Sequence, residues 1–516
     1  VIVSGAMIDM VLALALLGFA LREEVRPPRL KLLTSVTLAT ACTAAVVGIF
    51  VIRVDPMSLT STVFRHGRTR LPDDYKLLRY VDGRTASVTT IERTDKPGYR
   101  VIYTNGKPDA SVQLVRWPEG RKLEEGPAIA GDEPNQFLVG IIPFLFRPEA
   151  QQVAIIGFGS GVSVHTLLGS PNITRLDTIE IEPEMVESAK IFQPENIRAY
   201  EDPRSHIWFD DAKAYFASAG GSYDFIVSEP TNPWVSGVAS LFTVEFYRET
   251  KRYLKPNGML CQWIQGYELS DELFLSVLAA VDQEFVDFIV LRVGYRDWII
   301  MAVADGEIGP ISDALLRWDD MQYPLGLLGI RDLAQLQTLT MANKKLLHPH
   351  LATLRPNTDA FPLLDTGAEH ARFMREQADV LHELRNSPFP ILPVLAGVTM
   401  LRYPSAGIGD LRDPHVLEEA ERAVYLLRAY KETSLTVPGD MDVSSMRDFL
   451  GAQGAANQGQ AAWYDWVRAV FAVYEKTVPY IDVIGSEWWQ SVVRTAQQPS
   501  VPKEVVASIA LLDALG

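Results

Sequence analysis

Three glycines and two acidic residues stand where they could together bind a nucleoside. Gly157, Gly159 and Gly161 alternate directly after the apolar run 153–156, and a helix-like pattern follows them. Because glycine has no Cβ and tolerates a positive φ, such a turn lets a nucleotide-like ligand approach the backbone closely. For this motif alone, a tight strand–helix turn without a ligand is an equally good interpretation.

The acidic residues favour the interpretation with a ligand. Glu180 lies nineteen positions after the last glycine, in the alternating strand 178–182, where a carboxylate could hold both hydroxyls of a ribose. Asp211 follows the strand 206–209 and could accept an adenine amino group. The dinucleotide motif GxGxxG would need a glycine where Val162 stands. A nucleoside without a pyrophosphate, of the S-adenosylmethionine type, therefore fits better.

A parallel α/β sheet would bring these residues together. The expected strands are 153–156, 178–182, 206–209, 224–228 and 259–263, with a helix over 242–254 and a turn at 256–258. In open α/β sheets, ligands bind outside the carboxyl ends of the strands. We therefore expect a Rossmann-like, doubly wound sheet in which the glycines, Glu180, Asp211 and Glu229 line one crevice.

Different patterns flank this sheet. Upstream, a small antiparallel β domain is predicted from strands over 75–80, 86–91 and 99–103 and from the hairpin signal Asn105-Gly106, and a helix over 135–146 leads into the glycine strand. Downstream, helices are expected over 416–430, 461–474 and 502–515, and we interpret Trp463, Trp466, Trp488 and Trp489 as core residues.

The first part of the chain has the composition of membrane-spanning helices. Residues 1–21 are apolar apart from Ser4 and Asp9, and residues 32–52 carry no charge, so each run is long enough to cross a bilayer. A cleaved signal peptide would not explain the second run. The basic residues between the runs slightly favour a cytoplasmic link and a periplasmic soluble part. The expected location is a bacterial inner membrane, with membrane-protein partners.

Composition excludes some other classes of function. The net charge of −16 and the pI of about 5.1 disfavour binding to nucleic acid. The two cysteines, Cys42 and Cys261, give little support to a disulfide, a metal cluster or a thiol nucleophile. His348 and His350 are interpreted as a loop pair, so no metal site is predicted.

The motifs together resemble those of the spermidine synthases, which are aminopropyltransferases with the class I methyltransferase fold. The resemblance is closer still to the bacterial branch in which such a domain follows membrane spans. It extends over about residues 75–365. Its most specific segments are 157–161, 178–182, 228–234 with 240–247, and 262–263, joined by 357–359 with 362–364.

The resemblance implies a role for each site residue. Glu180 would hold the ribose, Asp211 the adenine, and the glycines with Ser160 the methionine-derived tail of S-adenosylmethionine or its decarboxylated form. Glu229 stands where the family has an Asp that accepts the proton of the attacking amine. Gln136, Asn232 and Gln262 would contact the amine substrate.

This chain also departs from the family pattern. Ser160 replaces the Asp that pairs with the amino group of decarboxylated S-adenosylmethionine, and Asn232 replaces a second acid. The family also has a Tyr-x-Glu arrangement before the glycine strand. In the corresponding segment of this chain, 135–137, only Gln136 matches it. A diamine carries two positive charges and needs several acids around it, so putrescine is disfavoured as the substrate.

We therefore expect five regions and consider two functions. The regions are 1–53, two transmembrane helices; 54–134, the β domain; 135–305, the nucleoside-binding domain; 306–375, a helical extension; and 376–516, a helical C-terminal region. One function is a membrane-anchored aminopropyltransferase-like enzyme. The other is a catalytically degenerate domain kept as a structural subunit of a membrane complex, for instance a photosynthetic or respiratory one, with partners held by the spans and the C-terminal helices.

Overall fold

The computed structural model describes most of the chain after residue 54. The described residues are 55–61, 67–121, 126–235, 237–294, 296–337, 339–381, 414–431, 443–456, 459–478 and 486–515, with the isolated positions 12, 40, 43, 63 and 483. Apart from isolated positions, the predicted membrane spans therefore lie outside the described residues. Within the described ranges, no helix is both long and apolar enough to cross a membrane. The chain divides into two compact units, 1–115 with 182–192 and 116–181 with 193–516.

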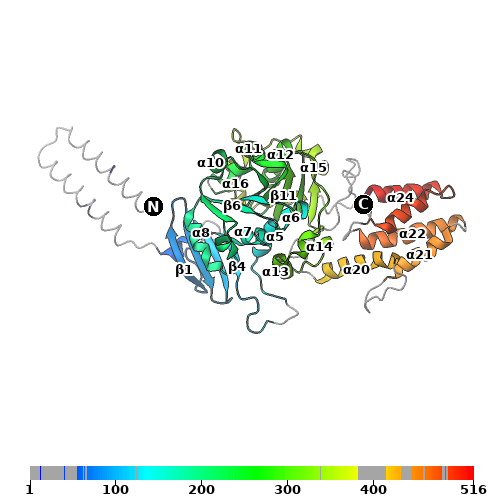
Figure 1. Ribbon diagram of the computed structural model, residues 1–516, viewed down its shortest axis with the longest axis horizontal. Helices are drawn as coiled ribbons and strands as arrows, with labels where there is room; N and C mark the ends of the chain where they lie inside the picture. Colours follow the sequence, from blue (N-terminus) through cyan, green and yellow to red (C-terminus); the bar gives the residue numbers. More distant parts are fainter. Residues whose placement is uncertain are drawn as a thin grey trace. The chain divides into compact units, whose positions relative to one another are not determined.

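The first unit is built on a four-stranded antiparallel sheet whose strands follow the order of the sequence (Figure 1). Its strands are β1 (Tyr75–Asp82), β2 (Ser87–Arg93), β3 (Tyr99–Thr104) and β4 (Lys107–Gln113). The predicted hairpin turn joins β3 to β4, and both of its residues have the positive φ that this turn requires, 50° at Asn105 and 78° at Gly106. The prediction missed β4 because the sequence KPDASVQ contains a proline and only one residue with a high preference for strands, Val112.

Helix α8 (Pro183–Ala189) groups with this sheet, although its residues lie within the predicted domain 135–305. The cause is Glu182, the residue before the helix. Its carboxylate accepts hydrogen bonds from the backbone N–H of Thr85 at 2.6 Å and of Ala86 at 3.2 Å. These bonds hold the pKa of Glu182 below its usual range despite its burial.

The second unit contains an eight-stranded mixed sheet in the order β12-β10-β11-β9-β8-β5-β6-β7. The parallel strands are β5 (Gln152–Ile156), β6 (Arg175–Glu180), β7 (Ser205–Phe209), β8 (Tyr223–Ser228) and β9 (Leu254–Gln265). Antiparallel strands β10 (Asp287–Arg292), β11 (Asp297–Val303) and β12 (Thr340–Asn343) extend the sheet beyond β9. The chain order reverses between β5 and β8, which is where a doubly wound sheet forms its ligand crevice.

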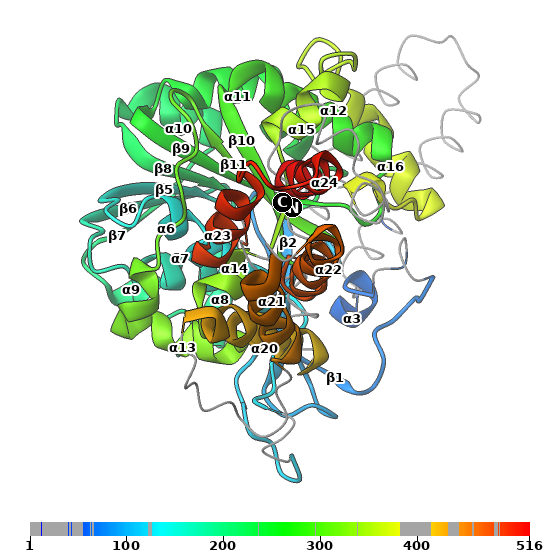
Figure 2. The same cartoon turned by 90° about the vertical axis from the view of Figure 1, so that its right-hand side faces the viewer.

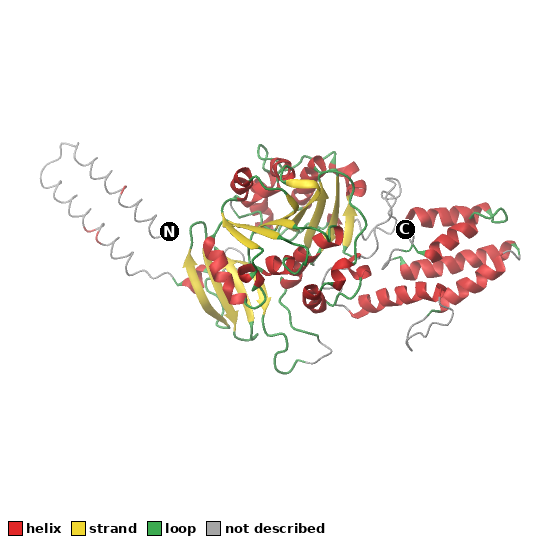
Figure 3. Ribbon diagram, in the orientation of Figure 1, coloured by secondary structure: helices red, strands yellow, loops and turns green. Residues whose placement is uncertain are grey.

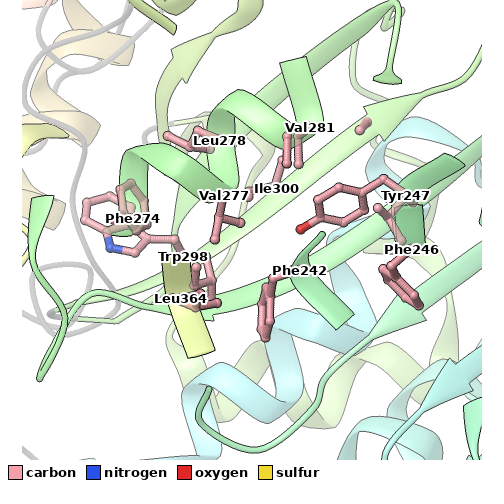
Figure 4. Packing of buried hydrophobic residues seen from close by; sticks show 14 of the residues in the cluster. Phe242, Phe246, Tyr247, Phe274, Val277, Leu278, Val281, Trp298, Ile300 and Leu364 are labelled. Carbon is pink, nitrogen blue, oxygen red and sulfur yellow. The ribbon is translucent and has the colours of Figure 1, made fainter. Parts of the chain in front are cut away.

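Helices cover both faces of this sheet (Figures 2 and 3). One face carries α5 (Glu133–Ile141), α6 (Pro143–Phe146) and α7 (Val162–Leu167). The other face carries α10 (Ala212–Ala219), α11 (Val244–Lys251), α12 (Asp271–Glu284) and α16 (Leu363–Met374). Figure 4 shows the core on this second face, where Phe274 packs against Trp298 and Phe242 belongs to the same cluster. Burial of these large apolar side chains stabilises the sheet that positions the site.

Asn357 fastens several elements of this core together, and it is fully buried. Its amide group donates to the Phe242 carbonyl at 2.9 Å and accepts from the Leu364 N–H at 3.1 Å. Its backbone N–H donates to the Ser276 carbonyl at 3.0 Å. The motif at 357–359 that resembles the family therefore has a structural role in this chain, at the meeting point of α11, α12 and α16.

Several predicted elements need correction. The helix expected over 242–254 is present as the shorter α11: the Thr243 hydroxyl caps its start by accepting the Phe246 N–H, and Leu254 already begins β9. Phe242 ends a preceding 3-10 turn, η3 (Val238–Phe242). The turn expected at 256–258 lies inside β9, as an irregularity with a φ of 58° at Asn257. The helix expected over 135–146 is interrupted at Pro143, which lacks the N–H that a continuous helix needs.

The extension after residue 305 also differs from the prediction, because it contains the edge strand β12 and the helices α13 (Asp319–Leu328), α14 (Leu333–Gln337) and α15 (Lys344–Leu351). His348 and His350 lie on α15 and do not form a loop pair. The His348 Nδ1 atom lies 2.8 Å from the Asp282 carboxylate, which anchors this helix to α12.

The C-terminal region is helical, as predicted. Its helices are α20 (Pro414–Lys431), α21 (Ser444–Ala455), α22 (Gln460–Thr477), α23 (Glu487–Ala496) and α24 (Lys503–Leu515). The four tryptophans interpreted as core are at most 3% exposed and lie in one cluster. Helices α21 and α23 were not predicted, although the apolar residues of α23, at 488–489, 492–493 and 496, recur at helical spacing.

Candidate functional site

The glycine turn follows β5 and is pressed against the end of β8. Gly157 has a φ of 96°, and a Cβ at this position would overlap the carbonyl oxygen of Glu229. The Glu229 N–H donates to the Ile156 carbonyl at 3.0 Å, and the Gly157 N–H donates to the Ile179 carbonyl at 2.9 Å. Only glycine fits a backbone held this tightly between two neighbouring strands.

Glu180 ends β6 and is tied directly to the glycine turn. Its Oε2 atom accepts a hydrogen bond from the Phe158 N–H at 2.9 Å, and its side chain is buried. The Asn196 amide donates to the Ser160 carbonyl at 2.6 Å and holds the turn from the other side. The structure therefore places Glu180 and the glycines together, with the carboxylate beside the backbone that a nucleoside would approach.

Gln136 and Ser160 contact each other. Helix α5 brings Gln136 to the glycine turn, where its side-chain oxygen accepts a hydrogen bond from the Ser160 hydroxyl. The Ser163 hydroxyl on α7 donates to the Gln136 carbonyl at 3.1 Å. Helix α5 itself is anchored by Glu133, which is fully buried and paired with Arg116 at 2.8 Å. The Gln136–Ser160 pair thus connects α5 to the turn.

Glu229, directly after β8, is a largely enclosed carboxyl group. Burial raises its pKa to about 7, and the nearby Ser163 side chain opposes this rise only in part. A carboxyl group that titrates near neutral pH is suited to act as a general base. The neighbouring Cys261 is buried, and both burial and the charge of Glu229 raise the pKa of its thiol. Cys261 therefore stays protonated and is a poor nucleophile.

Asp211 lies at the start of α10, at the carboxyl end of the adjacent strand β7. It is exposed, and its Oδ1 atom caps the helix by accepting the Ala214 N–H at 3.0 Å. Two large apolar residues at the same edge are unusually exposed, Ile181 by 49% and Phe209 by 48%. Sequence reasoning missed both, although each stands at the tip of a strand beside an acid. Exposed apolar surface of this kind could cover the face of an adenine ring.

Asn232 and Gln262 are buried and bonded within the protein. The Asn232 amide donates to the Tyr267 hydroxyl at 3.3 Å, and the Gln262 amide donates to the Trp263 carbonyl at 2.9 Å. The side-chain oxygen of Gln262 is buried without a hydrogen-bond partner among the described residues. In the described ranges, no three His, Cys, Asp or Glu side chains gather where they could hold a metal ion.

One further acid at this end of the sheet was not predicted. Asp297 begins β11, and burial raises its pKa to about 7. No local sequence signal marks it, because β11 belongs to the antiparallel part of the sheet and its neighbours come from distant positions in the chain.

Comparison with known proteins shows what this domain is similar to. Residues 135–304 match the family model described as spermine/spermidine synthase domain. A polyamine aminopropyltransferase from Nitrosomonas europaea is 27% identical over 236 residues, which are 43% of this chain and 71% of that protein. A polyamine aminopropyltransferase from Alkaliphilus oremlandii is 34% identical over 119 residues, which are 23% of this chain and 42% of that protein.

Among solved structures, a spermidine synthase in complex with the transition-state analogue AdoDATO aligns with a TM-score of 0.40 at 16% identity. The alignment covers 47% of this chain and 80% of that one. The residues matched by the family model include the glycine turn and its acids. Residues 135–304 are therefore similar to the spermine/spermidine synthase domain, which confirms the resemblance found in the sequence.

Proposed function

We propose that this domain binds a sulfonium nucleoside, with decarboxylated S-adenosylmethionine as the first candidate, and transfers its aminopropyl group to an amine. The observation that carries the proposal is Glu229, a carboxyl group with a pKa of about 7 whose backbone packs on the glycine turn. The names of the relatives, polyamine aminopropyltransferases, support the same reaction class.

The residues at the turn fit such a nucleoside. A Cβ at Gly159 would meet no atom within 4 Å, so there is space beside the middle of the turn. The Phe158 side chain does not fill that space: it is buried, lies 2.8 Å from a Cβ built at Gly161, and packs edge-on against Tyr200 at 5.5 Å. Glu180, Asp211 and the exposed Ile181 border the same end of the sheet, where a ribose and an adenine would lie.

Glu229 would act on the amine. In its ionised form it takes a proton from the acceptor ammonium group, which leaves a lone pair on the amine nitrogen. The bound nucleoside supplies the electrophilic carbon: a C–N bond forms there while the C–S bond breaks, and the electron pair goes to sulfur. The product is a neutral thioether and a protonated secondary amine, and Glu229 returns its proton to solvent. The charges and protons balance without a metal or a redox partner.

Placement of the amine also depends on Glu229. The carboxylate lies beside Ser163, whose hydroxyl donates to the Gln136 carbonyl, so α5 and α7 both border the amine site. Asn232 is uncharged, so it offers a hydrogen-bonding group but no negative charge that would attract a second ammonium group of the acceptor. Other groups on the acceptor must then be recognised elsewhere.

Two measurements on the full chain test the proposal. Calorimetric titration with decarboxylated S-adenosylmethionine, S-adenosylmethionine and methylthioadenosine should show binding, tightest for the nucleoside that is the true donor. Incubation with that donor and a panel of mono-, di- and polyamines should release the thioether nucleoside with at least one amine. The absence of binding by all three nucleosides would overturn the proposal and leave a domain that has kept only its fold.

A further inference from the structure

Ser160, in the glycine turn, is held from two sides by elements outside the turn. The Ser160 hydroxyl donates to the side-chain oxygen of Gln136 on α5, and the Asn196 amide donates to the Ser160 carbonyl at 2.6 Å. Asn196 belongs to the segment 193–197, directly before α9 (Arg198–Glu201). The position of Ser160 therefore depends on how α5 and this segment are fixed to each other.

Arg116 joins these two elements. Its Nη2 atom lies 2.8 Å from a carboxylate oxygen of Glu133 and 3.1 Å from a carboxylate oxygen of Glu195. Its Nη1 atom donates to the other oxygen of Glu133 at 3.0 Å. Glu133 begins α5, one helical turn before Gln136, and Glu195 directly precedes Asn196. One guanidinium group thus bridges the two elements that hold Ser160.

The bridge is shielded from water. The side chains of Arg116, Glu133 and Glu195 are 11%, 0% and 9% exposed. Burial alone would lower the pKa of Arg116, but the two carboxylates raise it above its usual range, so the group stays charged. Compared with apolar residues of the same shape, a buried ion pair adds little net stability. The directional contacts of this bridge therefore serve to fix geometry.

Arg116 is itself fixed by its neighbours. Its backbone carbonyl accepts the Ala128 N–H at 2.7 Å, and its Nη1 atom donates to the Ala128 carbonyl at 3.3 Å. Its Nε atom donates to the Tyr323 hydroxyl at 3.2 Å, and that hydroxyl donates to Glu195 at 2.7 Å. These contacts use several donors of one planar fork, which the single ammonium group of a lysine cannot reproduce.

We propose that Arg116 is a positioning residue for the nucleoside: by holding Glu133 and Glu195 together, it fixes Ser160 and the turn that contacts the methionine-derived tail. The inference rests on the proposed function for the identity of the ligand. Glu229 is fixed separately, by its backbone N–H on the Ile156 carbonyl at 3.0 Å. Loss of Arg116 should therefore weaken nucleoside binding and leave the chemical step nearly unchanged.

The test measures binding and transfer on the full chain of the Arg116→Lys variant. Calorimetric titration with decarboxylated S-adenosylmethionine and with S-adenosylmethionine gives Kd, and steady-state transfer gives KM and kcat. We expect the Kd and KM of the nucleoside to rise about 10–100-fold, because small displacements of a binding group have effects of this size. The kcat and the KM of the amine should stay within about threefold of the wild type.

A second variant separates positioning from stability. Arg116→Met/Glu133→Gln removes both charges, and residue 133 keeps an oxygen for the Ala130 N–H, which Glu133 accepts at 2.6 Å. It should melt near the wild type and still show the loss of nucleoside binding. The matched control is Arg252→Lys, because Arg252 is an exposed arginine paired with Glu249 at 2.9 Å, and this change should alter nothing.

Hydrogen exchange examines the turn without any ligand. The Gly161 N–H donates to the Phe158 carbonyl at 2.7 Å, and the Val162 N–H donates to the Ser160 hydroxyl at 3.2 Å. In both variants these amides should exchange about tenfold faster or more, while the amides of β5 and β8 keep their protection. Faster exchange of every strand, in step with a lower melting temperature, would show a merely structural role and refute the inference.

The outcomes distinguish this inference from the proposed function. Faster exchange at the turn, with no binding or transfer by the wild type, would support the role of Arg116 in ordering the turn and overturn the proposed function. Wild-type Kd and wild-type exchange in a folded variant would refute the role of Arg116, while transfer by the wild type would uphold the function. A lower kcat with an unchanged nucleoside KM would also contradict the role given to Arg116.

Discussion

The carbonyl oxygen of Glu229 occupies the space where a side chain at Gly157 would begin. The residue proposed as the base and the first glycine of the nucleoside-binding turn are thus in backbone contact, across the strands β5 and β8. In the proposed mechanism, binding of the nucleoside and activation of the amine both depend on this backbone contact. The backbone N–H of Glu229 reinforces it through the Ile156 carbonyl at 3.0 Å.

Replacement of Gly157 should break this contact. Gly157→Ala adds a Cβ that overlaps the Glu229 carbonyl and also strains a φ of 96°, so we expect a loss of about 3 kcal/mol or more in unfolding free energy. Gly159→Ala is the matched control, because its Cβ meets no atom and only the positive φ, 53°, costs about 1–2 kcal/mol. Denaturant unfolding measures both. Similar losses in the two variants would contradict the role given to the contact.

Glu180 is expected to combine a structural and a binding role. Glu180→Ala removes the acceptor for the Phe158 N–H and should lower stability by about 1–3 kcal/mol, besides abolishing nucleoside binding. Glu180→Gln keeps an oxygen that can accept that bond but loses the charged acceptor for the ribose. It should remain nearly as stable as the wild type and bind the nucleoside at least 10-fold more weakly. Full binding by Glu180→Gln, measured calorimetrically, would exclude the ribose contact.

Glu229 should reduce stability at neutral pH. Its pKa is about 7 in the folded protein and near its ordinary value of 4.5 in the unfolded chain, so between these values the folded state holds more protons. The contribution of Glu229 to the free energy of unfolding therefore falls as the pH rises from about 4.5 to 7. Glu229→Gln should be more stable than the wild type by about 2–3 kcal/mol at pH 8 and equal to it near pH 4.

The exposed Glu307 provides the control for this measurement, since Glu307→Gln should match the wild type at every pH. A Glu229→Gln variant that is less stable than the wild type at pH 8 would show that the carboxylate has a favourable partner. The group would then be structural, not held ready for catalysis.

The same pKa governs the predicted rate profile. Only the ionised carboxylate can accept a proton, so kcat for amine transfer should rise about tenfold per pH unit below pH 7 and level off above it. As the pH rises toward 7, ionisation of Glu229 thus lowers the stability of the protein and raises the rate of transfer. A rate that is flat between pH 5.5 and 8 would exclude Glu229 as the base.

The parallel half of the sheet could be predicted because its signals are local. Apolar runs ending in Gly157, Glu180, Asp211 and Glu229 place those residues at one edge by the rule for doubly wound sheets. The hydrogen bonds around them could not be predicted, since Gln136 and Asn196 reach the turn from helices and loops outside the motif.

The surroundings of the acid in the antiparallel half of the sheet could not be predicted, for a different reason. The surroundings of Asp297 come from two distant segments. The pairing of β11 with β9 places it opposite Gln265, and α5 brings Asn135 to it. These contacts join segments more than 30 and more than 160 positions apart in the chain. No periodicity or spacing within one segment encodes such a group.

The measurement that tests the central claim most directly is amine transfer by Glu229→Gln alongside its affinity for the nucleoside. We predict that the variant binds the nucleoside within a few-fold of the wild type, because Glu180 and Asp211 lie on other strands, and that its turnover falls by about 10²–10⁴-fold. Unchanged turnover, or a loss of nucleoside binding that accounts for the whole effect, would contradict the assignment of Glu229 as the base.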